Sequence, residues 1–81
     1  MIREVAAILK VEEAALKNAS RNRQIAEARG AICFIASRKL GFSGVEIAKA
    51  LSVTRSGVVR DARRGESVCN LNKDLKALYE E

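Results

Sequence analysis

Apolar residues recur at helical spacing near the start of the chain. They fall at positions 2, 5, 8 and 9, and the pattern repeats in shorter form at positions 11, 14, 15 and 16. Steps of three and four residues place apolar side chains on one face of a helix. The pattern therefore predicts a short helical lead-in over residues 1–17, built as a bent helix or a small helical pair. Capping residues predict a break at residues 18–20.

A long helix is predicted over residues 21–40. Gly41 directly follows its last apolar position, where glycine commonly ends a helix. Gly30 lies inside the helix and should cost about 1 kcal/mol relative to alanine. A close crossing with another helix at that point would explain it. The apolar stripe consists of Ile25, Ala28, Ile32, Ile35, Ala36 and Leu40.

Residues 43–64 predict two helices joined by a three-residue turn. Ser43 and Glu46 have the spacing of a capping box, which opens the first helix. Thr54 is placed to cap the second helix, which we expect to run to Arg64 and to end at Gly65.

A last helix is predicted over residues 70–79, because leucines at 71, 75 and 78 are spaced by four and three. We expect it to pack back on the core. The chain has no proline, and its commonest residues are helix formers. Together these patterns predict an all-α fold of five to six helices in a single domain, residues 1–81.

The two helices over residues 43–64 have the internal pattern of a helix-turn-helix, a motif whose second helix enters a DNA groove. Ala48 supplies the small residue needed where the two helices cross, and Ser52 occupies the turn position that is usually glycine. Asp61 falls where a small or apolar residue is usual, which leaves the rotation of the second helix open. The positions that the motif buries are Ile47, Leu51, Val53 and Val58.

Positive charge is concentrated in two segments of the chain. The net charge is +5; residues 21–41 hold five bases and one acid, and residues 52–65 hold four bases and one acid. This distribution favours a polyanionic partner, and the simpler alternative is a solvated basic surface.

Six residues form the outer face at the start of the second motif helix. Arginine can bind guanine through two hydrogen bonds, valine can contact a thymine methyl, and hydroxyls can bind phosphates. The alternative is that they are ordinary exposed residues of an amphipathic helix. The six are Thr54, Arg55, Ser56, Val59, Arg60 and Arg63.

Two arginines, Arg21 and Arg23, stand at the start of the predicted long helix. They could form a basic arm that reaches phosphates or a minor groove, or they could serve only solubility.

Several classes of site are disfavoured by composition. Cys33 lies in an apolar helical run and is expected to be a core residue. The sequence has no histidine and no CxxC motif, so no zinc site is expected. No signal peptide and no membrane-spanning run is recognised, and two cysteines make no disulfide scaffold, so a cytoplasmic setting is expected. No catalytic activity, cofactor or small-molecule substrate is expected.

The stretch from Ala28 to Ala48 resembles the C-terminal DNA-binding domain of the bacterial chromosomal replication initiator. The pairs Ala28–Arg29 and Glu46–Ile47 match that family without a gap. The resemblance implies a Trp-repressor-like fold and a phosphate contact for Arg29.

In the same family a basic loop before the long helix enters the minor groove, and its arginines fall on Arg21 and Arg23. The family's base-reading tetrad, Asp-His-Thr-Thr, falls on residues 55–58, which read Arg-Ser-Gly-Val. The resemblance therefore implies a shared docking mode and a different target sequence.

Nearly the whole chain is also similar to the C-terminal extension of transposases associated with repetitive extragenic palindromes. The similarity rests on a VxxxxL stretch at residues 11–16 and on a GxSxxEIAxxLxVxxxxVxRxxRRGE run at residues 41–66. Those transposases cut DNA with two histidines and a tyrosine in a separate domain. The resemblance implies that this chain is an excised DNA-binding domain or a remnant.

These patterns predict sequence-specific binding of double-stranded DNA. The main alternative is a helical protein-interaction module, which would expose an apolar patch in place of a basic one. An RNA-binding domain is disfavoured because the aromatics that stack on unpaired bases are few. A two-fold partner leaves no mark in a sequence, so a homodimer is left open.

Overall fold

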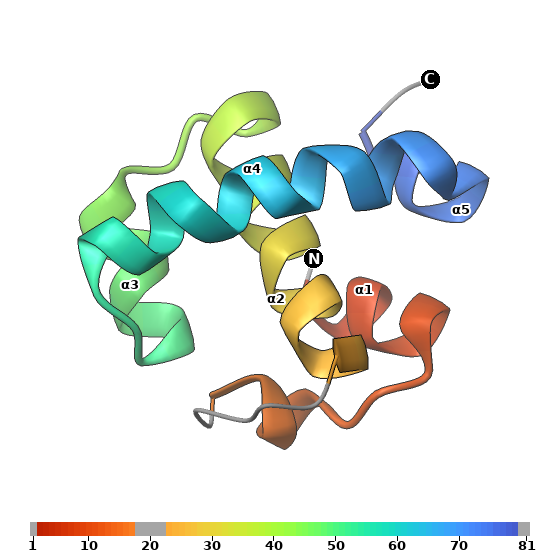
Figure 1. Ribbon diagram of the computed structural model, residues 1–81, viewed down its shortest axis with the longest axis horizontal. Helices are drawn as coiled ribbons and strands as arrows, with labels where there is room; N and C mark the ends of the chain where they lie inside the picture. The colour runs from red at the N-terminus through yellow and green to blue at the C-terminus, as the bar shows by residue number, and fades with distance from the viewer. Residues whose placement is uncertain (1, 18–22, 80–81) are drawn as a thin grey trace.

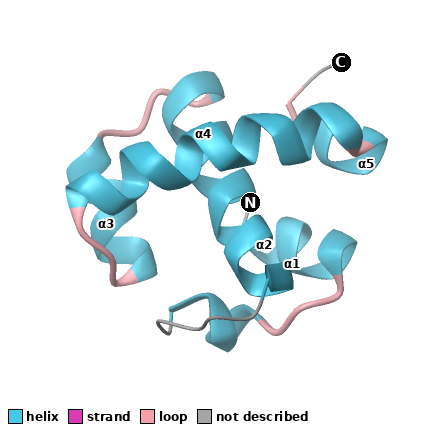
Figure 2. Cartoon of the chain, in the orientation of Figure 1, coloured by secondary structure: helices cyan, strands magenta, loops and turns pink. Residues whose placement is uncertain are grey.

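The computed structural model describes residues 2–17 and 23–79, and every regular element in these two ranges is helical (Figure 2). The predicted all-α fold is therefore confirmed. In chain order the elements are α1 (Ile2–Leu9), the 3-10 helix η1 (Glu13–Lys17), α2 (Arg23–Phe34), the π-helical turn η2 (Ile35–Lys39), α3 (Gly44–Leu51), α4 (Arg55–Leu71) and α5 (Lys73–Lys76).

Helix α2 forms the centre of the fold. Its second half is buried without interruption from Gly30 to Phe34, and the core continues into η2 through Ile35 and Ala36. Helix α4 crosses α2 on one side, while α1 and η1 contact α2 elsewhere (Figure 1). Every helical element of the described ranges contributes apolar side chains to one core cluster, among them Val5, Leu16, Ile32, Ile35, Leu51, Val58, Cys69 and Leu75.

The long helix predicted over residues 21–40 is present as α2 followed directly by η2, with its first two residues outside the described ranges. Its end is as expected: Gly41 has a φ of 76°, and the Phe42 amide donates to the Ala36 carbonyl at 2.9 Å. The lead-in consists of α1 and η1, separated by a turn in which Lys10 has a φ of 57°. The break predicted at residues 18–20 lies outside the described ranges.

Two glycines meet where α2 and α4 cross. A Cβ at Gly65 would overlap the Gly30 carbonyl group, and a Cβ at Gly30 would lie 2.8 Å from the Asp61 carbonyl oxygen. The helices therefore touch backbone to backbone, which confirms the close crossing expected at Gly30.

This crossing also corrects the predicted end of the second motif helix. Gly65 does not terminate it, because α4 continues through Gly65 to Leu71. Glycine is present here to let another backbone approach, and the structure offsets its low helix propensity with the packing that the crossing allows.

The last helix is shorter and starts later than predicted. Asn72 interrupts the chain with extended backbone angles, and its Oδ1 accepts hydrogen bonds from the Asp74 and Leu75 amides at 2.9 and 3.1 Å, which starts α5. Leu75 is buried as expected, whereas Leu71 belongs to α4 and is 89% exposed. The leucine spacing is helical, but Leu71 belongs to α4 and Leu75 to α5, so the predicted single helix combines residues of two helices.

Aromatic and cationic side chains hold the C-terminal segment against η2. The Tyr79 ring meets the Phe34 ring edge-on at 6.1 Å, and Lys39 Nζ lies 5.1 Å from the Tyr79 ring centre. Contacts of this kind are favourable in a partly desolvated setting. In the part of the chain that the structure describes, no helix has both the length and the apolar character to cross a membrane.

Candidate nucleic-acid interface

The candidate interface is built on α3, the turn of residues 52–54 and α4, which we call the α3–turn–α4 unit. Its first helix begins with the predicted capping box. The Glu46 amide donates to Ser43 Oγ at 3.2 Å, and the Ser43 amide donates to Glu46 Oε2 at 3.3 Å. Two of the unpaired amides at the helix start are thereby satisfied by local residues.

The turn is set by one left-handed residue and one cap. Ser52 has φ 56° and ψ 44°, the conformation for which glycine is usual, and the Val53 amide donates to the Ala48 carbonyl at 3.0 Å. Thr54 then caps α4, with its Oγ1 accepting from the Gly57 amide at 3.0 Å. The start of α4 is thus fixed by hydrogen bonds that lie within the turn itself.

The inner side of the unit is apolar, as the motif requires. Ile47, Leu51 and Val58 are buried, Ala48 is buried beside them, and Val53 is half-buried. Because Gly57 and Val58 are both buried, two of the positions that correspond to the initiator's reading tetrad face the core in this chain.

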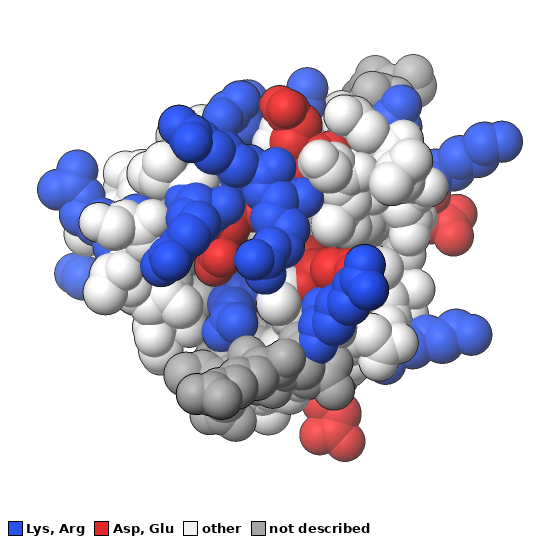
Figure 3. Space-filling model, in the orientation of Figure 1, with Lys and Arg blue, Asp and Glu red and all other residues white. Residues whose placement is uncertain are grey.

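The outer side of α4 carries most of the predicted site. Its residues are exposed on the face opposite the buried positions Val58, Ala62 and Cys69, and Val59 is 61% exposed among them. Thr54 is exposed as a residue, although its hydroxyl oxygen already accepts the capping bond. In Figure 3, Lys and Arg side chains gather over the middle of α4 and the start of α2, with acidic atoms between them. The predicted residues that share this face are Arg55, Ser56, Val59, Arg60 and Arg63.

Arg29 and Asp61 tie α2 to α4 beneath this face. Arg29 Nε lies 3.9 Å from Asp61 Oδ2, and the two side chains are only 12% and 20% exposed. Asp61 therefore occupies its unexpected place in the motif because it faces an arginine of the neighbouring helix. Arg29 points inward, apart from the exposed arginines, and its phosphate contact stays a prediction.

The predicted arm is described only in part. Arg21 lies outside the described ranges, whereas Arg23 is the first residue of α2 and its side chain is 92% exposed. Arg23 Nε donates to Glu27 Oε1 at 3.1 Å, a pair of neighbours one helical turn apart. An exposed pair of this kind is worth little and can exchange for another anion.

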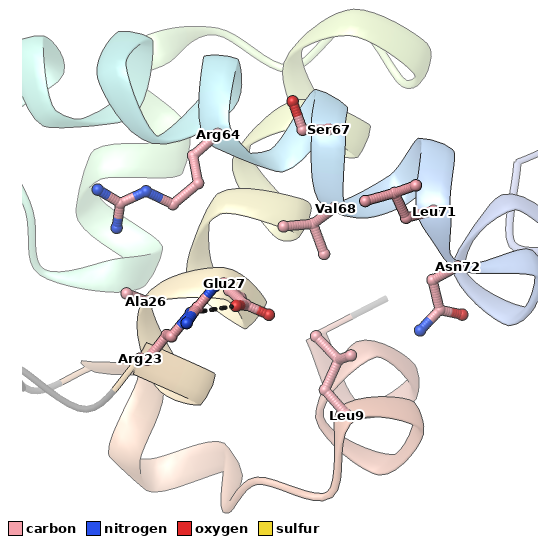
Figure 4. Close-up of a pocket in the computed structure, with 9 residues that line it drawn as sticks. All are labelled: Leu9, Arg23, Ala26, Glu27, Arg64, Ser67, Val68, Leu71 and Asn72. Carbon is pink, nitrogen blue, oxygen red and sulfur yellow. Dashed lines mark hydrogen bonds and ion pairs between the residues drawn. The ribbon is translucent and has the colours of Figure 1, made fainter.

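A groove of about 730 Å³ separates the start of α2 from the second half of α4 (Figure 4). Arg64 lines one edge of it, where its side chain leaves α4 and turns away from Val68 and Leu71, and the Arg23–Glu27 pair lies on the opposite wall. Sequence reasoning missed Arg64, because the helix was expected to end there. Its spacing of four residues from Arg60 is the signal that could have found it. The remaining lining residues are Leu9, Ala26, Ser67, Val68, Leu71 and Asn72.

Apolar side chains are also exposed on another part of the surface. Phe42 is 51% exposed and lines a second hollow of about 570 Å³ together with Ile2 and Ala50. Leu40, two residues earlier, is half exposed. The surface therefore has both the basic face expected of a DNA-binding module and some of the apolar exposure expected of a protein-interaction module.

Both cysteines are buried free thiols. Burial raises the pKa of the Cys33 thiol to about 12, and the nearby Asp61 carboxylate adds to the rise. Burial also raises the pKa of the Cys69 thiol, to about 11. Thiols of this kind are neutral and inert at physiological pH. Within residues 2–17 and 23–79 no group of histidine, cysteine and acidic side chains is arranged to hold a metal ion.

Comparison of the chain with protein-family models, with curated proteins and with solved structures finds no match.

Proposed function

We propose that the chain binds double-stranded DNA through a helix-turn-helix formed by the α3–turn–α4 unit. The observation that carries the proposal is the exposed face of α4, where Arg60 and Arg63 project from a helix whose start is rigidly capped. A helix of this width fits the major groove, and arginine is the side chain best suited to read guanine there. The reading residues in this proposal are Arg55, Ser56, Val59, Arg60 and Arg63.

The arm residues Arg21 and Arg23 extend the proposal to an adjacent stretch of DNA. Arg23 lies at the start of α2 on the same side of the molecule as Arg64, and α4 packs directly on α2. An arm in this place would reach a neighbouring phosphate or minor groove while α4 occupies the major groove. The proposed docking mode is that of the replication-initiator domain, with a different target sequence, in a transposase-related setting. No chemical step is assigned to the chain.

Gel-shift titration of a random-sequence duplex at two salt concentrations tests the proposal. We expect retardation at micromolar protein that weakens as salt rises, because displaced phosphate counterions make binding salt-dependent. The double variant Arg60→Glu/Arg63→Glu should abolish it. The control Arg3→Glu/Lys73→Glu makes the same change of charge on α1 and α5 and should retain most of the binding. Absence of salt-sensitive binding by the unaltered chain would overturn the proposal.

A second candidate is a protein-interaction module, favoured by the exposure of Leu71 and Phe42. Exposed apolar side chains of this size are a usual feature of protein contact surfaces. Sedimentation velocity over a range of protein concentrations tests for a second copy of the chain as partner. Self-association that is lost in Leu71→Asp, together with no retardation of DNA, would favour this candidate over the first.

A further inference from the structure

We infer that the groove between the start of α2 and the second half of α4 holds one phosphodiester strand of the DNA. The strand is the ridge that separates the major groove, occupied by α4, from the minor groove on the side of the arm. This inference rests on the proposed function and adds to it a site and a residue, Arg64, that is not among the proposed reading residues.

The charges at the groove suit a phosphate backbone. Arg64 lines one edge of it from α4, and Arg23 stands on the facing wall at the first residue of α2 (Figure 4). Among the described residues no carboxylate lies within ion-pair distance of Arg64, so its guanidinium is available to an incoming anion. Two cations on opposite walls can each bind a phosphate of one strand, one from each side.

The remaining walls suit the uncharged parts of the same strand. Ser67 is exposed beside the groove; its hydroxyl points away from the groove (Figure 4) and would have to rotate to donate to a phosphate oxygen there. Val68 and Leu71 provide an apolar surface beside it, against which the carbon face of a deoxyribose can pack. The exposure of Leu71 is then explained by the DNA that covers it.

The position of the groove between α4 and the start of α2 defines the path of the proposed DNA strand. Arg60 and Arg64 lie one helical turn apart along α4, so the groove adjoins the reading face without a gap. The arm residue Arg23 marks the far wall. A strand that leaves the reading face must cross this groove before it reaches the arm.

In the unbound protein, Glu27 opposes the binding of a phosphate in the groove. Its carboxylate holds Arg23 at 3.1 Å and places a negative charge on the groove wall. A bound phosphate must therefore take Arg23 from Glu27 and tolerate the carboxylate nearby. Removal of this charge should tighten binding.

The first test compares Arg64→Gln with Arg3→Gln, which removes the same charge from an exposed position on α1. Binding to a random-sequence duplex is measured over a series of salt concentrations. In Arg64→Gln the slope of log affinity against log salt should become shallower by about 0.9, the loss of one phosphate contact. Arg3→Gln should keep the slope of the unaltered chain.

The second test compares Glu27→Gln with Glu12→Gln, which removes the same charge from an exposed residue before η1. Affinity should rise several-fold more in Glu27→Gln than in Glu12→Gln. Equal gains would contradict a strand lying against Glu27. Ser67→Glu should weaken binding more than Ser67→Ala, because only the glutamate adds a negative charge to the groove.

The outcomes separate this inference from the proposed function. If the unaltered chain binds DNA and Arg60→Glu/Arg63→Glu abolishes binding, but Arg64→Gln behaves as Arg3→Gln, the groove does not hold the strand and the function stands. If the unaltered chain binds no DNA, both are overturned. An acidic peptide that binds the groove without competition from DNA would also overturn the inference.

Discussion

At the contact between α2 and α4, Gly30 and Gly65 carry no side chains, so the two helix backbones touch directly. We expect Gly65→Ala to destabilise the protein by roughly 3 kcal/mol, because its methyl group would overlap the Gly30 carbonyl and force the helices apart. Gly44→Ala is the control, since a Cβ there meets nothing within 4 Å. Urea unfolding followed by circular dichroism measures both. If Gly65→Ala lowered the free energy of unfolding no more than Gly44→Ala, the helices would not be in backbone contact at the crossing.

The buried thiols predict a loss of stability at alkaline pH. In the unfolded chain a cysteine thiol has a pKa of about 8.5. In the folded protein, burial raises the pKa of Cys69 to about 11 and that of Cys33 to about 12. The folded state thus holds both protons more tightly. Its advantage is complete below about pH 8.5 and is lost as pH rises towards the folded values.

Between about pH 9 and pH 10.5 the free energy of unfolding should fall by up to about 1.4 kcal/mol per pH unit for each thiol. Denaturant titrations at several pH values measure the slope. The double variant Cys33→Ala/Cys69→Ala will be less stable throughout because of the cavities it creates, but its stability should depend less on pH. An unchanged slope in that variant would assign the pH dependence to other groups.

At the scale of the helices, the Thr54 cap is the local device that starts α4. Thr54→Ala removes the acceptor of the Gly57 amide and should cost about 1 kcal/mol of stability. Ser56→Ala removes an exposed hydroxyl of the same helix turn and should change stability by less than about 0.5 kcal/mol. Thermal unfolding of the two variants compares them directly. Equal losses would mean that the cap contributes nothing beyond an exposed hydroxyl.

The Arg29–Asp61 pair joins α2 to α4, and a double-mutant cycle measures the coupling energy between the two side chains. We expect Arg29→Gln and Asp61→Asn to show a coupling energy of about 1 kcal/mol, because both side chains are largely shielded from water. The exposed pair Arg38–Glu66 joins η2, which directly continues α2, to α4 and is the matched comparison. Its coupling should be close to zero, as solvent screens it.

The elements that could be predicted are those whose signals are local. The capping box at Ser43 and the cap at Thr54 act within three residues, and the structure contains both. Gly65 looked like a helix end because glycine often has that role, but its partner Gly30 is far away in the sequence. The meaning of a glycine inside a helical pattern is decided by the backbone that approaches it, which no local signal contains.

The same limit applies to the candidate site. The outer face of α4 follows from helical periodicity, so the exposure of Ser56, Arg60 and Arg63 could be predicted from spacing alone. Arg64 and the groove beside it could not, because the groove exists only where the start of α2 meets the second half of α4. Asp61 likewise departs from the motif pattern because its partner, Arg29, lies on another helix.

At the scale of the whole molecule, size limits the length of DNA that one chain could cover in the proposed complex. The molecule measures 30 × 25 × 19 Å, and a base pair rises about 3.4 Å, so one copy spans about nine base pairs. Hydroxyl-radical footprinting on a selected target should show protection of about this length, on one face of the duplex. Protection of two such segments spaced by one helical turn would indicate a dimer.

The crossing of α2 and α4 has a consequence for how readily the target of the proposed DNA interface could change. The helix α4 is held to α2 through the Gly30–Gly65 backbone contact and the Arg29–Asp61 pair, whereas the proposed reading residues are all exposed. Positions 55, 56, 59, 60 and 63 can then be varied together without repacking the interior. The fold is suited to a selection library in which these five positions are randomised and new DNA targets are sought on an unchanged scaffold.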